Sequence, residues 1–239
     1  MLSRLRIVVG IACLGATAST AQFLREGFVG PGLSDKWSWA NEDDCAGVVK
    51  DGLALNPQSG CRQSAIGTTK SIYSWVPTGN SRNYQFTIAD WKITTNSHVS
   101  ARLFLVGNDA GPQPEAFSDF NKPNVIMAKL DLFEGAYYWN LYVKTNAASK
   151  NADGDEFKRS WLDVGATADG CTFGLSLNRG RARLWWQDAA GVRAEAGETS
   201  VPVGAFSKET TFYVGVKNDT GAKFDSSQTV TISKVAITP

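Results

Sequence analysis

The sequence predicts an all-β protein built as a sandwich or barrel of antiparallel strands. No stretch sustains the period of an amphipathic helix. Instead, short runs rich in Val, Ile, Thr, Phe, Tyr and Trp recur between clusters of Gly, Asn, Asp and Pro. Short strands separated by such turn residues are typical of sandwiches and barrels.

The clearest strands follow one another along the second two thirds of the chain. We expect strands at 84–94, 98–107, 124–133, 137–145, 171–177, 181–187, 211–217 and 229–237. The tripeptide Asn178-Arg179-Gly180 predicts a tight hairpin, because Asn and Gly accept the positive φ of such turns. The apolar residues of the last strand change phase after Ile232, which indicates a bulge near Ser233 and Lys234.

Residues 1–21 have the composition of a signal peptide. Arg4 and Arg6 precede a short apolar run, and small residues lead to a predicted cleavage after Ala21. Cleavage after Ala18 and lipid modification at Cys13 are the alternatives. No later stretch reaches the roughly 18 to 20 apolar residues of a membrane helix. We therefore expect export to a secreted, periplasmic or cell-surface location, without membrane insertion.

The mature chain, residues 22–239, has a length that suits a single all-β domain. It retains 22 Lys and Arg against 23 Asp and Glu, a net charge of −1. This balance gives no overall attraction to nucleic acid or to an anionic membrane. The sequence also contains no nucleic-acid-binding motif, and it does not predict an oligomeric state.

Three cysteines remain after cleavage, and an exported chain permits disulfides. Cys45 and Cys61 flank a predicted hairpin, so we pair them. Cys171 lies in an apolar run and is expected to be a buried thiol. A zinc site is not expected, because the chain has a single histidine.

Two long irregular segments are predicted at 107–123 and 146–160. Loops of this length usually bind a ligand or remain mobile. Asn151, Asp153 and Asp155 alternate as in a calcium loop, but the Gly and Glu that complete such a loop are missing. We expect a polar surface loop, no cofactor, and no clear motif for a structural calcium.

Several segments together resemble one known superfamily. The opening "REGFVGPGLSDKWSW", the middle "IADWKIT" and "ARLFLVG", and the closing "TFYVGVKN" and "TVTISKVAI" resemble the concanavalin A-like lectins and glucanases, over residues 23–238. The resemblance implies two antiparallel sheets stacked as a jelly roll, with the last strand beside the first. The superfamily includes lectins, glycosidases, lyases and adhesion modules, so the resemblance implies the fold and no single activity.

Alternation within the strands separates a core face from an open face. The residues predicted to face the core are Val99, Ala101, Leu103, Leu105, Ile126, Ala128, Leu130, Leu132, Tyr137, Trp139, Leu141, Val143, Ala182, Leu184 and Trp186. Those predicted to face outward are His98, Ser100, Arg102, Lys129, Asp131, Tyr138, Asn140, Tyr142, Lys144, Arg181, Arg183, Trp185 and Gln187.

The outward set combines aromatic rings, amides and charges, which suit the apolar face and the hydroxyl rim of a sugar. From it we take Arg102, Lys129, Asp131, Tyr138, Asn140, Tyr142, Arg183 and Trp185 as candidate glycan-binding residues. Cations outnumber acids in the set, which favours an anionic polysaccharide. Any solvated sheet face also alternates in this way, and that interpretation remains open.

Catalysis requires groups that the chain supplies only in part. The superfamily's retaining glycosidases carry Glu-x-Asp-x-x-Glu on one strand, and here the spacing is Lys129-x-Asp131-x-x-Glu134. A cation at the position of the nucleophile argues against that mechanism. A uronate lyase using His98 and Tyr138 as proton-transfer groups is the enzyme alternative. A non-catalytic glycan-binding protein is the leading hypothesis, and a structural or adhesion module is the third.

Overall fold

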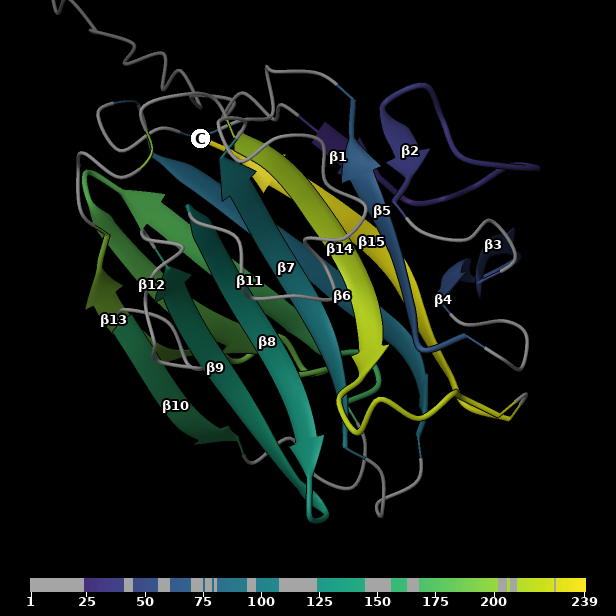
Figure 1. The fold of residues 1–239 in the computed structure, drawn as a ribbon. Coiled ribbons are helices and arrows are strands. Elements are labelled where there is room, and N and C mark those ends of the chain that lie inside the picture. The colour runs from purple at the N-terminus through teal and green to yellow at the C-terminus, as the bar shows by residue number, and fades with distance from the viewer. Residues whose placement is uncertain are drawn as a thin grey trace, which may run out of the picture.

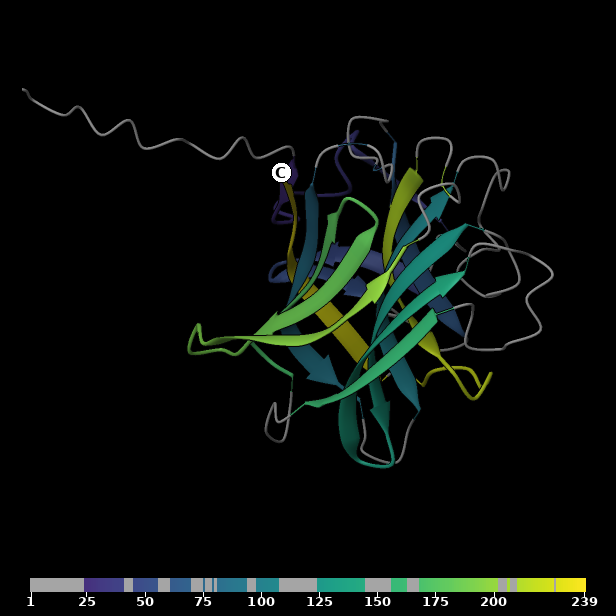
Figure 2. The same cartoon turned by 90° about the vertical axis from the view of Figure 1, so that its left-hand side faces the viewer.

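The strands of the computed structural model form two antiparallel sheets stacked face to face (Figure 1). The structure describes residues 24–40, 45–55, 61–69, 75, 79, 81–93, 98–107, 124–144, 156–162, 168–201, 206, 210–225 and 227–239, without the side chains of 156–162. The expected signal peptide and most of the two expected loops lie outside the described residues. Figure 2 shows the two layers from the side.

The first sheet, sheet A, has the order β13-β12-β11-β6-β15-β4-β3, with β1 also paired to β15. Its strands are β1 (Leu24–Glu26), β3 (Ala46–Val49), β4 (Gly52–Leu55), β6 (Arg82–Lys92), β11 (Thr172–Asn178), β12 (Arg181–Gln187), β13 (Arg193–Ser200) and β15 (Thr229–Thr238). The last strand therefore lies beside the first, as the superfamily resemblance implied.

The second sheet, sheet B, has the order β10-β9-β8-β7-β14-β5-β2. Its strands are β2 (Trp37–Trp39), β5 (Gln63–Thr68), β7 (Val99–Gly107), β8 (Val125–Phe133), β9 (Ala136–Lys144), β10 (Glu156–Leu162) and β14 (Thr210–Asn218). The predicted all-β, two-sheet sandwich is confirmed. In the described part of the chain, no helix is long and apolar enough to cross a membrane.

Tight turns join two pairs of neighbouring strands. Glu134 and Gly135 connect β8 to β9, with φ of 51° and 78°. Arg179 and Gly180 connect β11 to β12, with φ of 43° and 79°. Two successive residues with positive φ match the twist of a hairpin. The second hairpin was predicted, although the positive φ falls on Arg179 and not on Asn178, which pairs with Arg181.

Two strands differ from expectation. Glu156–Leu162, which overlaps the end of the segment 146–160 expected to be a loop, forms the edge strand β10, and Arg193–Ser200, which was not among the expected strands, forms β13. Both strands lie at sheet edges, where only one neighbouring strand provides ladder hydrogen bonds. The predicted bulge of the last strand is confirmed by a register shift between Ile232 and Lys234.

The core lies between the sheets. The residues predicted to face the core form part of one buried apolar cluster, except Trp186, which is partly buried and packs against that cluster. Aromatic rings dominate its centre, where Phe86, Trp139 and Phe173 contact one another. The burial of these rings supplies much of the driving force that holds the two layers together.

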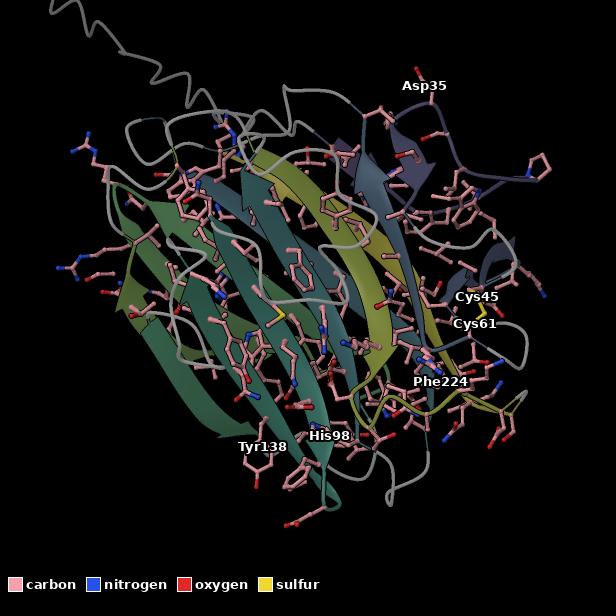
Figure 3. All side chains as sticks on the ribbon, viewed as in Figure 1. Asp35, Cys45, Cys61, His98, Tyr138 and Phe224 are labelled. Carbon is pink, nitrogen blue, oxygen red and sulfur yellow. A yellow bond between two sulfur atoms is a disulfide. The ribbon has the colours of Figure 1, made fainter. Side chains whose placement is uncertain are left out.

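The three cysteines behave as predicted. Cys45 and Cys61 form a disulfide that encloses the hairpin β3–β4 (Figure 3). Cys171 is a buried free thiol, and burial raises its pKa. A thiol in this state is a poor nucleophile.

Trp185 lies against the outer face of sheet A. Its indole covers Gly174, its cross-strand partner on β11, and the Arg193 guanidinium stacks above it, 4.0 Å from the ring centroid. The indole Nε1 donates to Ser176 Oγ at 3.1 Å. The ring is therefore almost fully buried on the surface of its own sheet.

Gly174→Ala tests this packing. A Cβ at position 174 would lie 2.0 Å from Trp185 Cε2, so the indole must move. We expect a loss of about 1 to 3 kcal/mol in the free energy of unfolding, measured by urea denaturation. Gly47→Ala is the control, because a Cβ added at position 47 would meet no heavy atom within 4 Å. Equal stability of the two variants would contradict the packing described.

Candidate functional site

Six of the eight predicted glycan-binding residues lie on three neighbouring strands of sheet B. The strand register pairs Arg102 with Lys129, Lys129 with Asn140, and Asp131 with Tyr138. All of them are on the outer face, because the alternate positions fill the core. Figure 3 shows His98 and Tyr138 at the same end of the sheet.

The other two, Arg183 and Trp185, lie elsewhere. Both belong to β12 in sheet A, so they are on the opposite side of the sandwich. The expectation of one shared face is therefore wrong for this pair. Alternation along a strand reveals which side faces the core, but it does not reveal to which sheet the strand belongs. Arg183 is instead ion-paired with Glu198, and Trp185 is covered by Arg193.

The outer face of sheet B was expected to be open, and along β7, β8 and β9 it is largely buried. One part of it is apolar and consists of Ala40, Ala65, Phe104, Val106, Val125, Met127 and Tyr142, with Tyr213 packed against them. Lys144 on this face is buried as well. These strands therefore bury both faces, which a single-sided alternation does not predict.

The remaining part of the buried outer face carries charge. We call His98, Arg102, Lys129, Asp131 and Asp219 the charged cluster. Lys129 Nζ lies 3.0 Å from Asp131 Oδ2 and 3.1 Å from Asp219 Oδ2. Arg102 donates through Nη2 to Asp219 Oδ1 and through Nε to Ser100 Oγ at 2.7 Å.

Asp219 was not among the predicted site residues, although it completes the charged cluster. It follows β14 in a turn that Asn218 stabilises. The Asn218 Oδ1 accepts hydrogen bonds from Thr220 N at 3.2 Å and from Thr220 Oγ1 at 2.7 Å. The backbone N of Asp219 donates to His98 O at 2.8 Å, which fastens the turn to the start of β7. A strand end followed by Asn-Asp-Thr-Gly is the signal that identifies such a turn.

The Asn218-Asp-Thr sequence also matches an N-glycosylation sequon. The Asn218 side chain is buried and accepts two hydrogen bonds within the turn. A modified asparagine needs an exposed side chain, so this turn serves the charged cluster and does not suit a glycan acceptor.

The two cations of the charged cluster are balanced by its two acids. Burial by itself would raise the pKa of Asp219, but the charges of Arg102 and Lys129 and the hydrogen bonds from Ser100 and Lys129 lower it below its ordinary value of 3.8. Asp219 is therefore a carboxylate at neutral pH. Within the charged cluster Asp219, which was not among the residues counted, supplies the second carboxylate and cancels the excess of cations.

An aromatic rim borders the charged cluster where β7, β8 and β9 meet the β8–β9 turn. It consists of His98, Phe133 and Tyr138. The His98 and Phe133 rings meet edge to face with centroids 4.8 Å apart, and Tyr138 is the cross-strand partner of Asp131. The His98 side chain is 31% exposed and Phe133 is 36% exposed. The His98 and Phe133 rings of the rim are therefore more exposed than the other four side chains of the charged cluster, Arg102, Lys129, Asp131 and Asp219.

Two buried acceptors lie behind the rim. Asp131 Oδ1 is 3.1 Å from His98 Nε2 without an aligned hydrogen bond, and Asn140 Oδ1 has no hydrogen-bond partner among the described residues. The Asn140 amide donates to Asp131 Oδ2 at 3.2 Å. Buried acceptors are normally paired, so these two oxygens are exceptions among the described residues.

The two acids of the Glu-x-Asp-x-x-Glu spacing are not arranged as a glycosidase pair. Lys129 stands at the nucleophile position of the Glu-x-Asp-x-x-Glu pattern, Asp131 is ion-paired and only 1% exposed, and Glu134 lies in the exposed β8–β9 turn. Asp131 and Asp219 lie close together, but the lowered pKa of Asp219 prevents it from acting as the general acid at neutral pH.

No protein-family model matches the sequence, and neither does any curated protein. Solved structures match the fold. The lectin from Bauhinia forficata in complex with GalNAc has a TM-score of 0.60 at 10% identity, covering 91% of this chain and 98% of the lectin. The laminarinase from Flavobacterium sp. UMI-01 has a TM-score of 0.59 at 10% identity, covering 92% and 100%.

The exoplasmic/lumenal domain of VIP36, solved with Ca²⁺ and Man2, has a TM-score of 0.57 at 12% identity, covering 85% of this chain and 80% of that one. At such identities the likeness establishes the fold alone. The chain thus has the concanavalin A-like jelly-roll fold of lectins and glucanases, as the sequence resemblance implied.

Asp219→Asn tests whether the charged cluster stabilises the fold. The substitution leaves two buried cations, Arg102 and Lys129, and only one carboxylate in the charged cluster, that of Asp131. We expect it to lower the free energy of unfolding by about 3 to 5 kcal/mol. The control is Asp90→Asn, which removes an exposed pair with Lys92 and should cost less than about 1 kcal/mol. Similar losses in both variants, measured by urea denaturation, would argue against the cluster.

The same comparison has a defined pH dependence. The pKa of Asp219 is lower in the folded chain than its ordinary value of 3.8. Asp219 therefore makes its full contribution to the stability of the fold at pH values well above 3.8. This contribution is lost as the pH falls from 3.8 through the lower folded pKa. The stability difference between wild type and Asp219→Asn should stay constant above about pH 5 and narrow below 3.8. A difference that widens in acid would refute the assignment.

Proposed function

We propose that this chain is an exported carbohydrate-binding protein and that the aromatic rim is its ligand-binding surface. The observation that carries the proposal is the group of accessible rings at one end of sheet B, beside the polar side chains of the charged cluster. Phe133 and Tyr138 offer ring faces for the apolar side of a pyranose, and His98 offers a polar edge for its hydroxyls.

The fold adds support by analogy. The Bauhinia forficata lectin was solved with GalNAc and the VIP36 domain with Man2, so proteins of this fold bind sugars. Export is supported by the Cys45–Cys61 disulfide, since disulfides persist in oxidising compartments, and by the predicted signal peptide.

The charge balance of the site favours a neutral glycan. The sequence predicted an anionic polysaccharide because five cations were counted against Asp131: Arg102, Lys129, Lys144, Arg181 and Arg183. Arg181 and Arg183 lie on the other sheet, and Arg102 and Lys129 remain as the cations of the charged cluster. Both are instead ion-paired with buried carboxylates, and a polyanion gains little from cations that are already neutralised. We therefore infer that the ligand is a neutral polysaccharide or glycan chain.

Phe133→Ala is the direct test of the rim. Loss of one stacking ring should weaken binding to the preferred neutral polysaccharide about three- to tenfold, measured by affinity gel electrophoresis against β-glucan, mannan and galactan. Val49→Ala is the matched control, because Val49 is another exposed apolar residue, on the edge strand β3 of sheet A. It should leave binding unchanged.

Two outcomes would contradict the proposal. Retention on alginate or heparin in preference to every neutral polysaccharide would refute the neutral ligand. Failure to bind any polysaccharide would refute the carbohydrate-binding function and favour a structural or adhesion module.

One observation favours a polysaccharide lyase as a second candidate. His98 Nε2 lies 3.1 Å from Asp131 Oδ1, and Tyr138 is the cross-strand partner of the same aspartate. An imidazole beside a carboxylate, with a phenol on the neighbouring strand, supplies the group types that proton transfer requires. If the chain is a lyase, incubation with alginate or pectate produces an unsaturated, ultraviolet-absorbing product, and His98→Ala abolishes it. No absorbance change with wild type eliminates this candidate.

A further inference from the structure

Three side chains of the charged cluster present the atoms that normally ligate a metal ion. His98 Nε2 or Nδ1 and one carboxylate oxygen each from Asp131 and Asp219 lie within 4.8 Å of one another. An imidazole with two carboxylates is a donor set that zinc and manganese accept, and carboxylate oxygens also suit calcium.

A cation of the protein itself already occupies the neighbourhood of these atoms. Lys129 Nζ lies 3.0 Å from Asp131 Oδ2 and 3.1 Å from Asp219 Oδ2, so one ammonium bridges both carboxylates. Arg102 binds the other oxygen of Asp219. A divalent ion within bonding distance of the same oxygens would stand close to both side-chain cations, and their repulsion in a buried site is strong. The native residues therefore do not fit a metal.

The surroundings hold the ammonium in this bridging position. Lys129 comes from β8 between the strands that carry Arg102 and Asn140, and the Tyr142 ring centroid lies 5.9 Å from Nζ. The lysine is buried, and charge pairs of a buried ammonium persist because exposing either partner alone is costly. Apart from His98, the two cations and the two acids of the charged cluster cancel in charge.

We propose that Lys129 is a fixed internal cation that takes the place of a metal ion in the charged cluster. Its ammonium holds Asp131 and Asp219 together, so the native chain binds no divalent cation here. Removal of the ammonium leaves an excess negative charge and converts His98, Asp131 and Asp219 into a divalent-cation site. The proposal concerns the cluster alone and does not depend on glycan binding.

The test compares the full chain with Lys129→Met and Lys129→Gln after chelator treatment at neutral pH. Mn²⁺, Zn²⁺ and Ca²⁺ are each added, and binding is measured by isothermal titration calorimetry and thermal unfolding. Wild type should show no saturable binding and no change in Tm. The two variants should have a lower Tm than wild type and recover about 5 to 10 °C with at least one ion at about 100 times its Kd.

Two controls separate the cluster from other sites. Lys144→Met removes another buried lysine of the same sheet face and should not create cation binding. Lys129→Met combined with Asp131→Asn restores the charge balance by removing a ligand, and its Tm should not respond to the ions.

Saturable binding by wild type that is lost in Asp219→Asn would overturn the proposal, because the native site would then accept a metal. The proposal would also be overturned if none of the three ions stabilised either Lys129 variant. This holds whether or not the variant is folded in the absence of the ions. A response of Lys144→Met equal to that of Lys129→Met would likewise contradict it.

Discussion

Arg102 and Lys129 point away from the core of the sandwich and are nevertheless buried, so each needs a carboxylate within hydrogen-bond distance. That requirement determines how this end of sheet B is built. Asp131 supplies one carboxylate from the same strand as Lys129, and the turn after β14 supplies Asp219. Because the backbone of Asp219 is also bonded to His98, the turn, the start of β7 and the side chains of β8 form one connected unit. Removing Asp219 takes away the carboxylate that pairs with Arg102 and one of the two that pair with Lys129, which costs more than a single pair contributes.

The same requirement separates buried, ion-paired side chains from more exposed rings at this end of sheet B. Side chains whose types first suggested sugar binding, such as Arg102 and Lys129, are already engaged in the ion pairs. The more exposed side chains there are His98, Phe133 and Tyr138, which form the surface proposed for the ligand, and Phe133 was not among the predicted residues. The spacing that in glycosidases carries two catalytic carboxylates has a different role here. Lys129 and Asp131 neutralise each other, and Glu134 forms the turn to β9.

The sequence was sufficient for the core and insufficient for the assembly of the site. Alternation in strands such as β7 and β8 predicted the buried residues correctly, because each core position follows from a period of two. The grouping of Arg183 and Trp185 with the other candidates failed, since strand periodicity carries no information on sheet membership. Asp219 was missed because it lies in a turn far along the chain from Asp131 and approaches it only when β14 pairs with β7. The burial of the outer face of sheet B was also not predictable, because the strands alternate apolar and polar residues as if only one face were buried.

The most direct measurement is a crystal structure of the wild-type protein grown with Mn²⁺ and recorded at the manganese absorption edge. We expect that Lys129 Nζ lies between Asp131 and Asp219, that Arg102 contacts Asp219, and that no anomalous peak is present among these side chains. The central claim is that Arg102 and Lys129 neutralise the carboxylates of Asp131 and Asp219. An anomalous peak between these two carboxylates, with Lys129 turned away from them, would contradict it.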